Sequence, residues 1–187
     1  GGLESLPLAV QKGIENDFRI IETIPNCAIS VGTTWFNLFH PDPVMREVLR
    51  NKDFRLGLSH SVNRDEVNER LFKGAGSVSN PTVVFGPPYH GERFARVGLE
   101  YDVDLANQLL DNAGLSSRDS DGFRLRPDGQ RIRILLSIPN KWSLLATEAA
   151  DLYQGYWEAI GVEVQPTVVE WSTFWSQIDN SEHDVAV

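Results

Sequence analysis

The last third of the chain alternates between two apolar patterns, and this alternation constrains the fold more than any other feature. Residues 131–138, 162–169 and 184–187 are short, mainly apolar runs that predict strands. Residues 144–160 and 171–178, which lie between them, place apolar side chains at helical spacing. The order strand, helix, strand, helix, strand predicts right-handed crossovers. We therefore predict an α/β fold with a parallel βαβαβ core.

The upstream part predicts a further pair of strands and several short helices. Residues 19–24 and 28–38 are predicted strands with a Pro25-Asn26 turn between them, and this pair makes the expected sheet mixed. Helices are predicted over residues 44–51, 53–62, 64–73 and 102–112, and a short strand over residues 123–126. Residues 74–100 contain several Gly and Pro residues and predict a long loop.

The composition fits one globular unit and excludes several classes of protein. At about 100–200 residues per domain, a chain of 187 residues is one domain or one lobe of a larger protein. Its 17 basic residues are scattered and its net charge is −9, which argues against nucleic-acid binding. No apolar run approaches the ~20 residues that span a bilayer. Cys27 is the single cysteine, so no disulfide can form within the chain. The start of the sequence is no signal peptide, so we expect a mature form, a cytoplasmic protein or a fragment.

Two motifs suggest enzyme chemistry, but each lacks a residue that the chemistry needs. Ser59, His60 and Asp65 suggest a hydrolase, yet Ser61 stands where a nucleophile elbow has its second glycine, and the segment is a predicted helix. Residues 74–76 (Gly-Ala-Gly) begin like a dinucleotide-binding fingerprint but follow a helix and lack the third glycine. The four histidines are far apart in the sequence. We predict no catalytic residue, no metal site and no cofactor.

An acidic stretch at residues 117–128 has part of the spacing of a calcium-binding loop. Its members are Ser117, Asp119, Asp121, Gly122 and Asp128, at positions 1, 3, 5, 6 and 12 of such a loop. Position 12 is Asp rather than the longer Glu, and predicted strands follow instead of a helix. A simple acidic turn is therefore favoured, and a calcium site stays an open alternative.

Polar and aromatic residues follow the ends of two predicted strands. Glu170 and Trp171 come directly after the strand at residues 162–169, and Trp175 lies one turn further on. Asn140 and Trp142 follow the strand at residues 131–138. Because α/β sheets bind ligands at the carboxyl ends of their strands, these five residues are the predicted ligand-binding residues. The tryptophans could instead pack on the sheet as part of the core.

Several segments, in order, resemble bacterial extracellular solute-binding proteins of family 5, the peptide- and nickel-type receptors of ABC importers. Residues 53–67 (DFRLGLSHSVNRDEV) are similar to that family's D-x-R-x-A-L-S-x-A-I-D-R-x-x-I segment. Residues 101–114 resemble its Y-D-P-x-x-A-x-x-L-L-x-x-A-G helix, and residues 119–123 its acidic hairpin. Residues 158–164, followed by Glu170-Trp171 and Phe174, resemble its I-G-I-x-V strand and the next helix. The resemblance covers about residues 35–187.

The resemblance implies one lobe of a two-lobed receptor of the type II periplasmic-binding-protein kind. We expect residues 1–36 to be lead-in strands near a hinge, and residues 37–187 to be a C-terminal lobe truncated at its C-terminal side. In the oligopeptide-binding members, the tryptophan that matches Trp171 and the residue four later line the peptide pocket. Ile178 and Asp179 stand where those members have basic residues. Tryptophans equally suit sugar rings, which some members bind.

The implied function is capture of a peptide or a similar oligomeric nutrient between two lobes, for delivery to the permease of an ABC transporter. The resemblance also implies a monomer in the periplasm or at the cell surface, and no enzymatic activity. Two alternatives stay open: an oligosaccharide-binding member of the same family, and a ligand-sensing effector domain of a regulator. A hydrolase using Ser59 and His60 is a third hypothesis.

Overall fold

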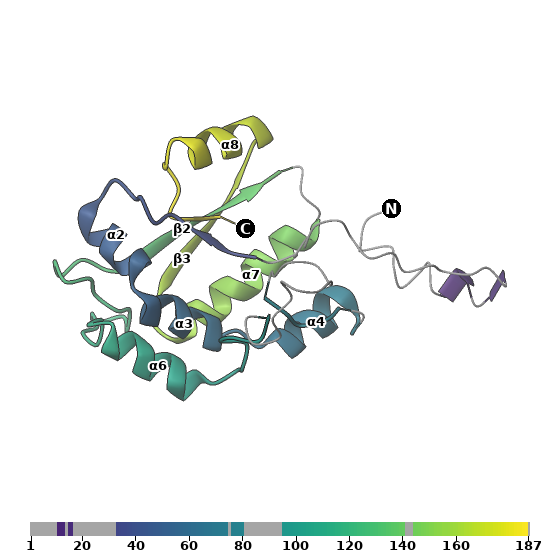
Figure 1. The fold of residues 1–187 in the computed structure, drawn as a ribbon, viewed down its shortest axis with the longest axis horizontal. Coiled ribbons are helices and arrows are strands. Elements are labelled where there is room, and N and C mark those ends of the chain that lie inside the picture. Colours follow the sequence, from purple (N-terminus) through teal and green to yellow (C-terminus); the bar gives the residue numbers. More distant parts are fainter. Residues whose placement is uncertain are drawn as a thin grey trace, which may run out of the picture. The chain divides into compact units, whose positions relative to one another are not determined.

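The computed structural model describes residues 11–13, 15–16, 33–74, 76–80, 95–140 and 144–186, which contain a four-stranded sheet in the order β1-β4-β2-β3 (Figure 1). The strands are β1 (Trp35–Phe36), β2 (Arg133–Pro139), β3 (Glu163–Val169) and β4 (Val185–Ala186). β2 pairs in parallel with both β3 and β4, whereas β1 is antiparallel to β4. The mixed sheet and its parallel core are therefore confirmed.

The chain divides into two units, which are described separately. The first unit comprises residues 1–31 and 64–99 and includes α4 (Arg64–Phe72). The second unit comprises residues 32–63 and 100–187 and contains the sheet together with the helices α2 (Pro43–Arg50), α3 (Lys52–His60), α6 (Val103–Asn112), α7 (Leu144–Ala159) and α8 (Trp171–Asp179). The division expected between residues 36 and 37 stays a prediction.

The core of the second unit forms where the sheet meets its crossover helix. α7 joins β2 to β3 and packs on both strands, while α8 joins β3 to β4 (Figure 1). On β2, Ile134 and Leu136 have no exposed surface. On α7, Trp157 is 2% exposed and donates its indole N–H to the carbonyl oxygen of Leu58 on α3 at 3.2 Å. α3 is thereby tied to the layer that covers the sheet. None of the described helices is long and apolar enough to cross a membrane.

Short polar side chains set where the helices begin. Asp42 accepts hydrogen bonds from the first N–H groups of α2, and Asp102 does the same for α6. Asn51 both ends α2 and caps α3, so the two helices follow each other with no intervening loop. At Gly57 on α3, an added Cβ would lie 3.0 Å from the carbonyl oxygen of Ala106 on α6. A residue without a side chain therefore allows α3 and α6 to pack closely.

A buried asparagine holds β1 against β4. Asn37 is 4% exposed, and its amide nitrogen donates to the carbonyl oxygens of Ser181 at 2.9 Å and His183 at 2.8 Å. Its backbone N–H donates to the carbonyl oxygen of Asp184 at 2.9 Å. The carboxylate of Asp184 in turn accepts from the N–H of Leu135 on β2 at 2.8 Å. These bonds fix the position of β1, which is only two residues long.

Two predicted strands differ from the structure, and two further predictions fall wholly or largely outside the described residues. Within the predicted strand 28–38, only Trp35–Phe36 is a strand among the described residues, and residues 19–24 lie outside them. The predicted strand 123–126 is replaced by two isolated antiparallel bridges, Arg118 with Arg124 and Leu125 with Arg131. The tight turns around Gly122 and Gly129, both with positive φ, leave too few residues for a continuous ladder. Much of the predicted loop 74–100 also lies outside the described residues.

Arg124 is a buried cation at the centre of the second unit. Its side chain is 1% exposed, and it donates to the carbonyl oxygens of Ile160 at 2.9 Å and Leu115 at 2.7 Å. It also donates to the carboxylate of Asp111 at 2.5 Å and the amide oxygen of Asn107 at 2.8 Å. One side chain therefore joins the ends of α6 and α7.

Replacing Arg124 with leucine should lower the free energy of unfolding by about 3–5 kcal/mol, because buried carbonyl groups lose their donor. The measurement is equilibrium urea unfolding followed by circular dichroism. Arg133→Leu is the matched control, since that arginine is 60% exposed in its pair with Glu163 and should change the value by less than about 1 kcal/mol. Equal effects of the two substitutions would contradict the central role of Arg124.

Candidate functional site

The carboxyl ends of β2 and β3 lie side by side, as the sequence predicts. Pro139 pairs with Val169, and the backbone N–H of Asn140 donates to the carbonyl oxygen of Val169 at 2.8 Å. α8 begins directly after β3, so Trp171 and Trp175 occupy the first two turns at this edge. Four of the five predicted residues are thus brought together, and Trp142 lies outside the described residues.

Asn140 and Glu170 cap α8. The amide oxygen of Asn140 accepts from the N–H of Trp171 at 3.1 Å. The carboxylate of Glu170 accepts from the N–H of Ser172 at 2.6 Å and also from the Ser172 hydroxyl. An anionic side chain at this position also complements the positive end of the helix dipole. These two residues position the tryptophans, and their role as ligand contacts stays a prediction.

Three tryptophans form an aromatic cluster at this edge. The ring centroids of Trp171 and Trp175 are 5.7 Å apart in an edge-to-face arrangement, and those of Trp175 and Trp35 are 6.3 Å apart. Phe174 contacts Trp175 at 5.4 Å and is buried, with 2% of its surface exposed. Phe174 thus belongs to the core. The tryptophans are less buried: Trp171 and Trp175 are half-buried, and Trp35 is 43% exposed.

Sequence reasoning missed Trp35. The residue lies about 150 positions before its partner strand, and its pairing with Ala186 places it at this edge. The only available signal was an aromatic residue within a predicted strand, which by itself indicates no ligand contact. The antiparallel direction of β1 turns its first residue toward the carboxyl ends of the other strands.

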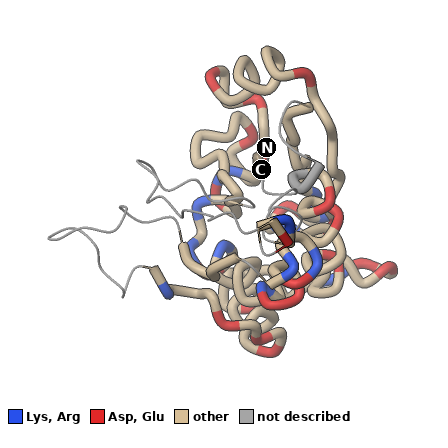
Figure 2. The backbone as a smooth tube through the Cα atoms, turned by 90° about the vertical axis from the view of Figure 1, so that its right-hand side faces the viewer, with Lys and Arg blue, Asp and Glu red and all other residues tan. Residues whose placement is uncertain are grey.

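The backbone around the cluster carries acidic and neutral residues. After Arg133 the sequence has one basic residue, Lys141, which lies outside the described residues. Figure 2 shows acidic and uncharged positions along α8. Among the described parts of β2, β3 and α8, the one lysine or arginine is Arg133, which pairs with Glu163 at the amino ends of the two strands. A negatively charged ligand group at the carboxyl ends would therefore find no cationic side chain on these described parts.

Of the proposed hydrolase residues, His60 has a structural role and Ser59 does not lie at a nucleophile elbow. His60 is 8% exposed at the end of α3, and its Nδ1 lies 2.8 Å from the carbonyl oxygen of Glu100. The carbonyl oxygen of His60 accepts from the N–H of Asp102 at 2.9 Å. Ser59 lies in the last turn of the same helix and not at a strand-to-helix turn. The geometry of a nucleophile elbow is absent at Ser59.

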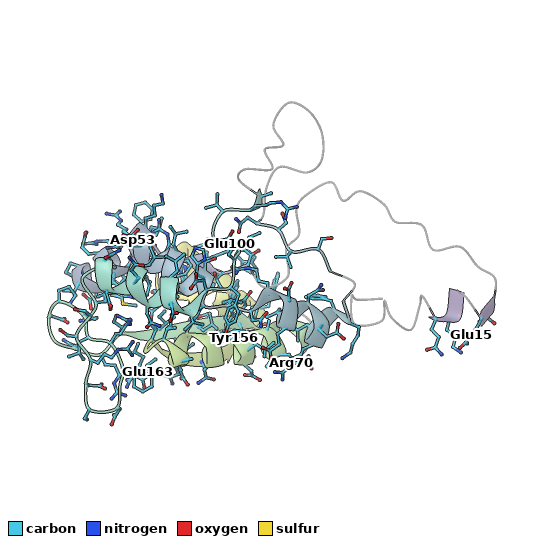
Figure 3. All side chains as sticks on the ribbon, turned by 90° about the horizontal axis from the view of Figure 1, so that it is seen from below. Glu15, Asp53, Arg70, Glu100, Tyr156 and Glu163 are labelled. Atoms are coloured by element: carbon cyan, nitrogen blue, oxygen red, sulfur yellow. The ribbon has the colours of Figure 1, made fainter. Side chains whose placement is uncertain are left out.

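Arginines engage the carboxylates of the acidic stretch. Asp119 accepts from Arg131 at 2.6 Å and from the backbone N–H groups of Asp121 and Phe123. The carboxylate of Asp121 lies 2.5 Å from the same guanidinium group, and Asp128 pairs with Arg126. Glu163, labelled in Figure 3, is a further partner of Arg131 at 3.7 Å. No group of three or more metal-binding side chains was found within the described ranges. The acidic turn is thus an arginine–carboxylate network.

Comparison with known proteins identifies the family. Residues 11–187 match the model of the family described as "Bacterial extracellular solute-binding proteins, family 5 Middle". The chain belongs to this family. It is 26% identical to the periplasmic alpha-galactoside-binding protein of Rhizobium meliloti over 137 residues, which are 71% of this chain and 20% of the relative. It is also 26% identical to the oligopeptide-binding protein AppA of Bacillus subtilis over 139 residues, 74% of this chain and 25% of AppA.

Solved structures of binding proteins share this fold. The oligopeptide-binding protein OppA matches with a TM-score of 0.84 and 30% identity, over 99% of this chain and 29% of OppA. A periplasmic binding protein solved in complex with stachyose matches with a TM-score of 0.74 and 17% identity, over all of this chain and 29% of that one, which shows the fold alone. The chain therefore has the fold of type II periplasmic binding proteins and spans a fifth to a quarter of the curated relatives.

Millimolar calcium should leave the melting temperature unchanged, because the carboxylates of the acidic turn are already engaged by arginines. Differential scanning fluorimetry with calcium chloride against magnesium chloride is the measurement. A rise in melting temperature that is specific to calcium and lost in Asp119→Asn would restore the calcium site.

Acid should destabilise the turn. The hydrogen bond from Arg126 is the largest influence on Asp128 and lowers the pKa of its carboxyl. Desolvation alone would raise the pKa of Asp119, but the bonds from Arg131 and the backbone N–H groups outweigh it and lower that pKa. Groups with a lowered pKa stabilise the fold above their unfolded pKa, about 3.9 for Asp, and this stabilisation is lost as the pH falls further. The urea concentration at the unfolding midpoint should therefore decrease as the pH drops below about 4. The decrease should be less steep in Asp128→Asn. Parallel profiles for the two proteins would contradict this.

Proposed function

We propose that the chain is part of the C-terminal lobe of the substrate-binding component of an ABC importer. In this proposal, the full-length receptor captures an oligomeric nutrient between two lobes and delivers it to the membrane permease. The observation that carries the proposal is the cluster of half-exposed tryptophans at the carboxyl ends of β2 and β3, in a chain of family 5. The cluster lies where α/β folds bind their ligands.

Two ligand classes are candidates. Peptides are supported by the names of relatives, among them an oligopeptide-binding protein and a dipeptide-binding protein. Oligosaccharides are supported by the alpha-galactoside-binding relative and by the acidic, aromatic character of the described edge. The family is described as extracellular and one relative is named as periplasmic, which supports a location outside the cytoplasmic membrane.

The mechanism is closure of two lobes on the ligand, with no covalent step. A ligand that contacts both lobes binds the closed state better than the open state and therefore shifts the equilibrium toward closure. This lobe would contribute aromatic surface that is already in place before binding. α8 is capped at its first turn by Glu170 and Asn140, so the indoles need little further ordering when ligand arrives.

Replacing Trp171 with alanine in the full-length receptor should weaken ligand binding by 1 kcal/mol or more, about fivefold in dissociation constant, as expected for an anchoring aromatic residue. Isothermal titration calorimetry measures the affinity, with a ligand first found by its saturable change in tryptophan fluorescence. Val168→Ala is the control, since Val168 is 55% exposed on β3 but precedes the edge. An unchanged affinity in Trp171→Ala would remove that residue from the site.

A further inference from the structure

The register of the sheet places Trp35 at the edge formed by the carboxyl ends of β2 and β3. Trp35 pairs with Ala186 of β4, and Ala186 pairs with Ser137 of β2. Ser137 lies two residues before the end of β2, where Asn140 meets the end of β3. Trp35, although it lies far earlier in the chain, is thus held at the same level of the sheet as the start of α8.

Phe174 packs against Trp175, and all three indoles keep part of their surface exposed. Phe174 and Trp157 are each 2% exposed and belong to the core, whereas Trp35 is 43% exposed. Trp175 lies between the other two, with centroid distances of 5.7 Å to Trp171 and 6.3 Å to Trp35. Adjacent, partly exposed aromatic rings are unusual on a soluble surface and are typical of ligand contacts.

The groups beside these rings are neutral or already engaged. Glu170 is hydrogen-bonded at the start of α8, and Asp179 lies at the opposite end of that helix. The hydroxyl groups of Ser172 and Thr173 and the amide of Asn140 are uncharged, and all three residues are exposed. A peptide carboxylate on this surface would lose its hydration without gaining a cationic partner from the described residues, which is unfavourable.

We infer that Trp35, Trp171 and Trp175 form one aromatic surface that binds an uncharged sugar ring of the transported ligand. This inference rests on the proposed receptor function. A pyranose ring presents C–H groups on its faces, which pack against flat indole rings, and hydroxyl groups at its rim, which exchange hydrogen bonds with amides and hydroxyls. The surface supplies both kinds of partner.

The test uses the full-length receptor and two sets of probes, one of uncharged oligosaccharides and one of tripeptides. Isothermal titration calorimetry is run at pH 7 with an oligosaccharide panel (stachyose, cellotetraose, maltotetraose and mannohexaose) and with trialanine and trilysine. We expect saturable binding of at least one sugar and none of either peptide. Trp35→Ala should weaken sugar binding at least fivefold, and Trp35→Phe should weaken it less because a flat ring remains.

Two control variants separate the surface from general effects. Phe39→Ala removes an aromatic ring that is 73% exposed on the turn after β1, and it should change sugar affinity less than twofold. Lys141→Met removes the one basic residue that follows Arg133, and it should also change sugar affinity less than twofold. Melting temperatures of all variants, measured in parallel, establish that each is folded.

Each contrary outcome overturns a different statement. Saturable binding of a tripeptide without any sugar overturns the sugar surface and leaves the receptor function standing; preference for trilysine would point to an ammonium group on the indoles. Sugar binding that Trp35→Ala does not weaken overturns the role of Trp35. Binding of neither set overturns the sugar surface, and if the fluorescence screen also finds no ligand, the receptor function fails with it.

Discussion

The second unit depends on the parallel pairing of β2 with β3. The register runs without interruption from Arg133 opposite Glu163 to Pro139 opposite Val169. Because both strands end at the same level, Asn140 reaches the end of β3 and caps the helix that begins there. A shift of the register by one residue would turn the buried side chains of the shifted strand outward and separate this cap from its helix.

Most of the acidic residues around the 117–131 turns have structural partners. Arg124 bonds to a carboxylate near the end of α6 and to a backbone carbonyl group after α7. Arg131 bonds to a carboxylate of the turn and lies near Glu163 at the start of β3. Arg126 joins Asp128 to Asp42, which also caps α2. The negative charge of this region is thus paired locally, and the same carboxylates that suggest a calcium loop by their spacing hold the turn closed.

At the carboxyl ends of β2 and β3, polar residues position α8 and aromatic residues present surface. Asn140 and Glu170 use their side-chain oxygens to fix the start of α8, and the tryptophans present partly exposed rings. The chain spans a fifth to a quarter of its curated relatives. At this edge the described residues present partly exposed aromatic surface.

The sequence by itself determined the parallel core, the helix boundaries and the neighbourhood of Asn140, Glu170, Trp171 and Trp175. These follow from local periodicity, capping residues and the rule that parallel strands end at one edge. Only the tertiary structure decided that Trp35 joins them, that Arg124 is buried, and that arginines occupy the acidic turn. The position of Trp35 depends on pairing with a strand about 150 residues away. The arginine–carboxylate pairs depend on which of several partners each arginine reaches, and the spacing of carboxylates along the sequence does not reveal that choice.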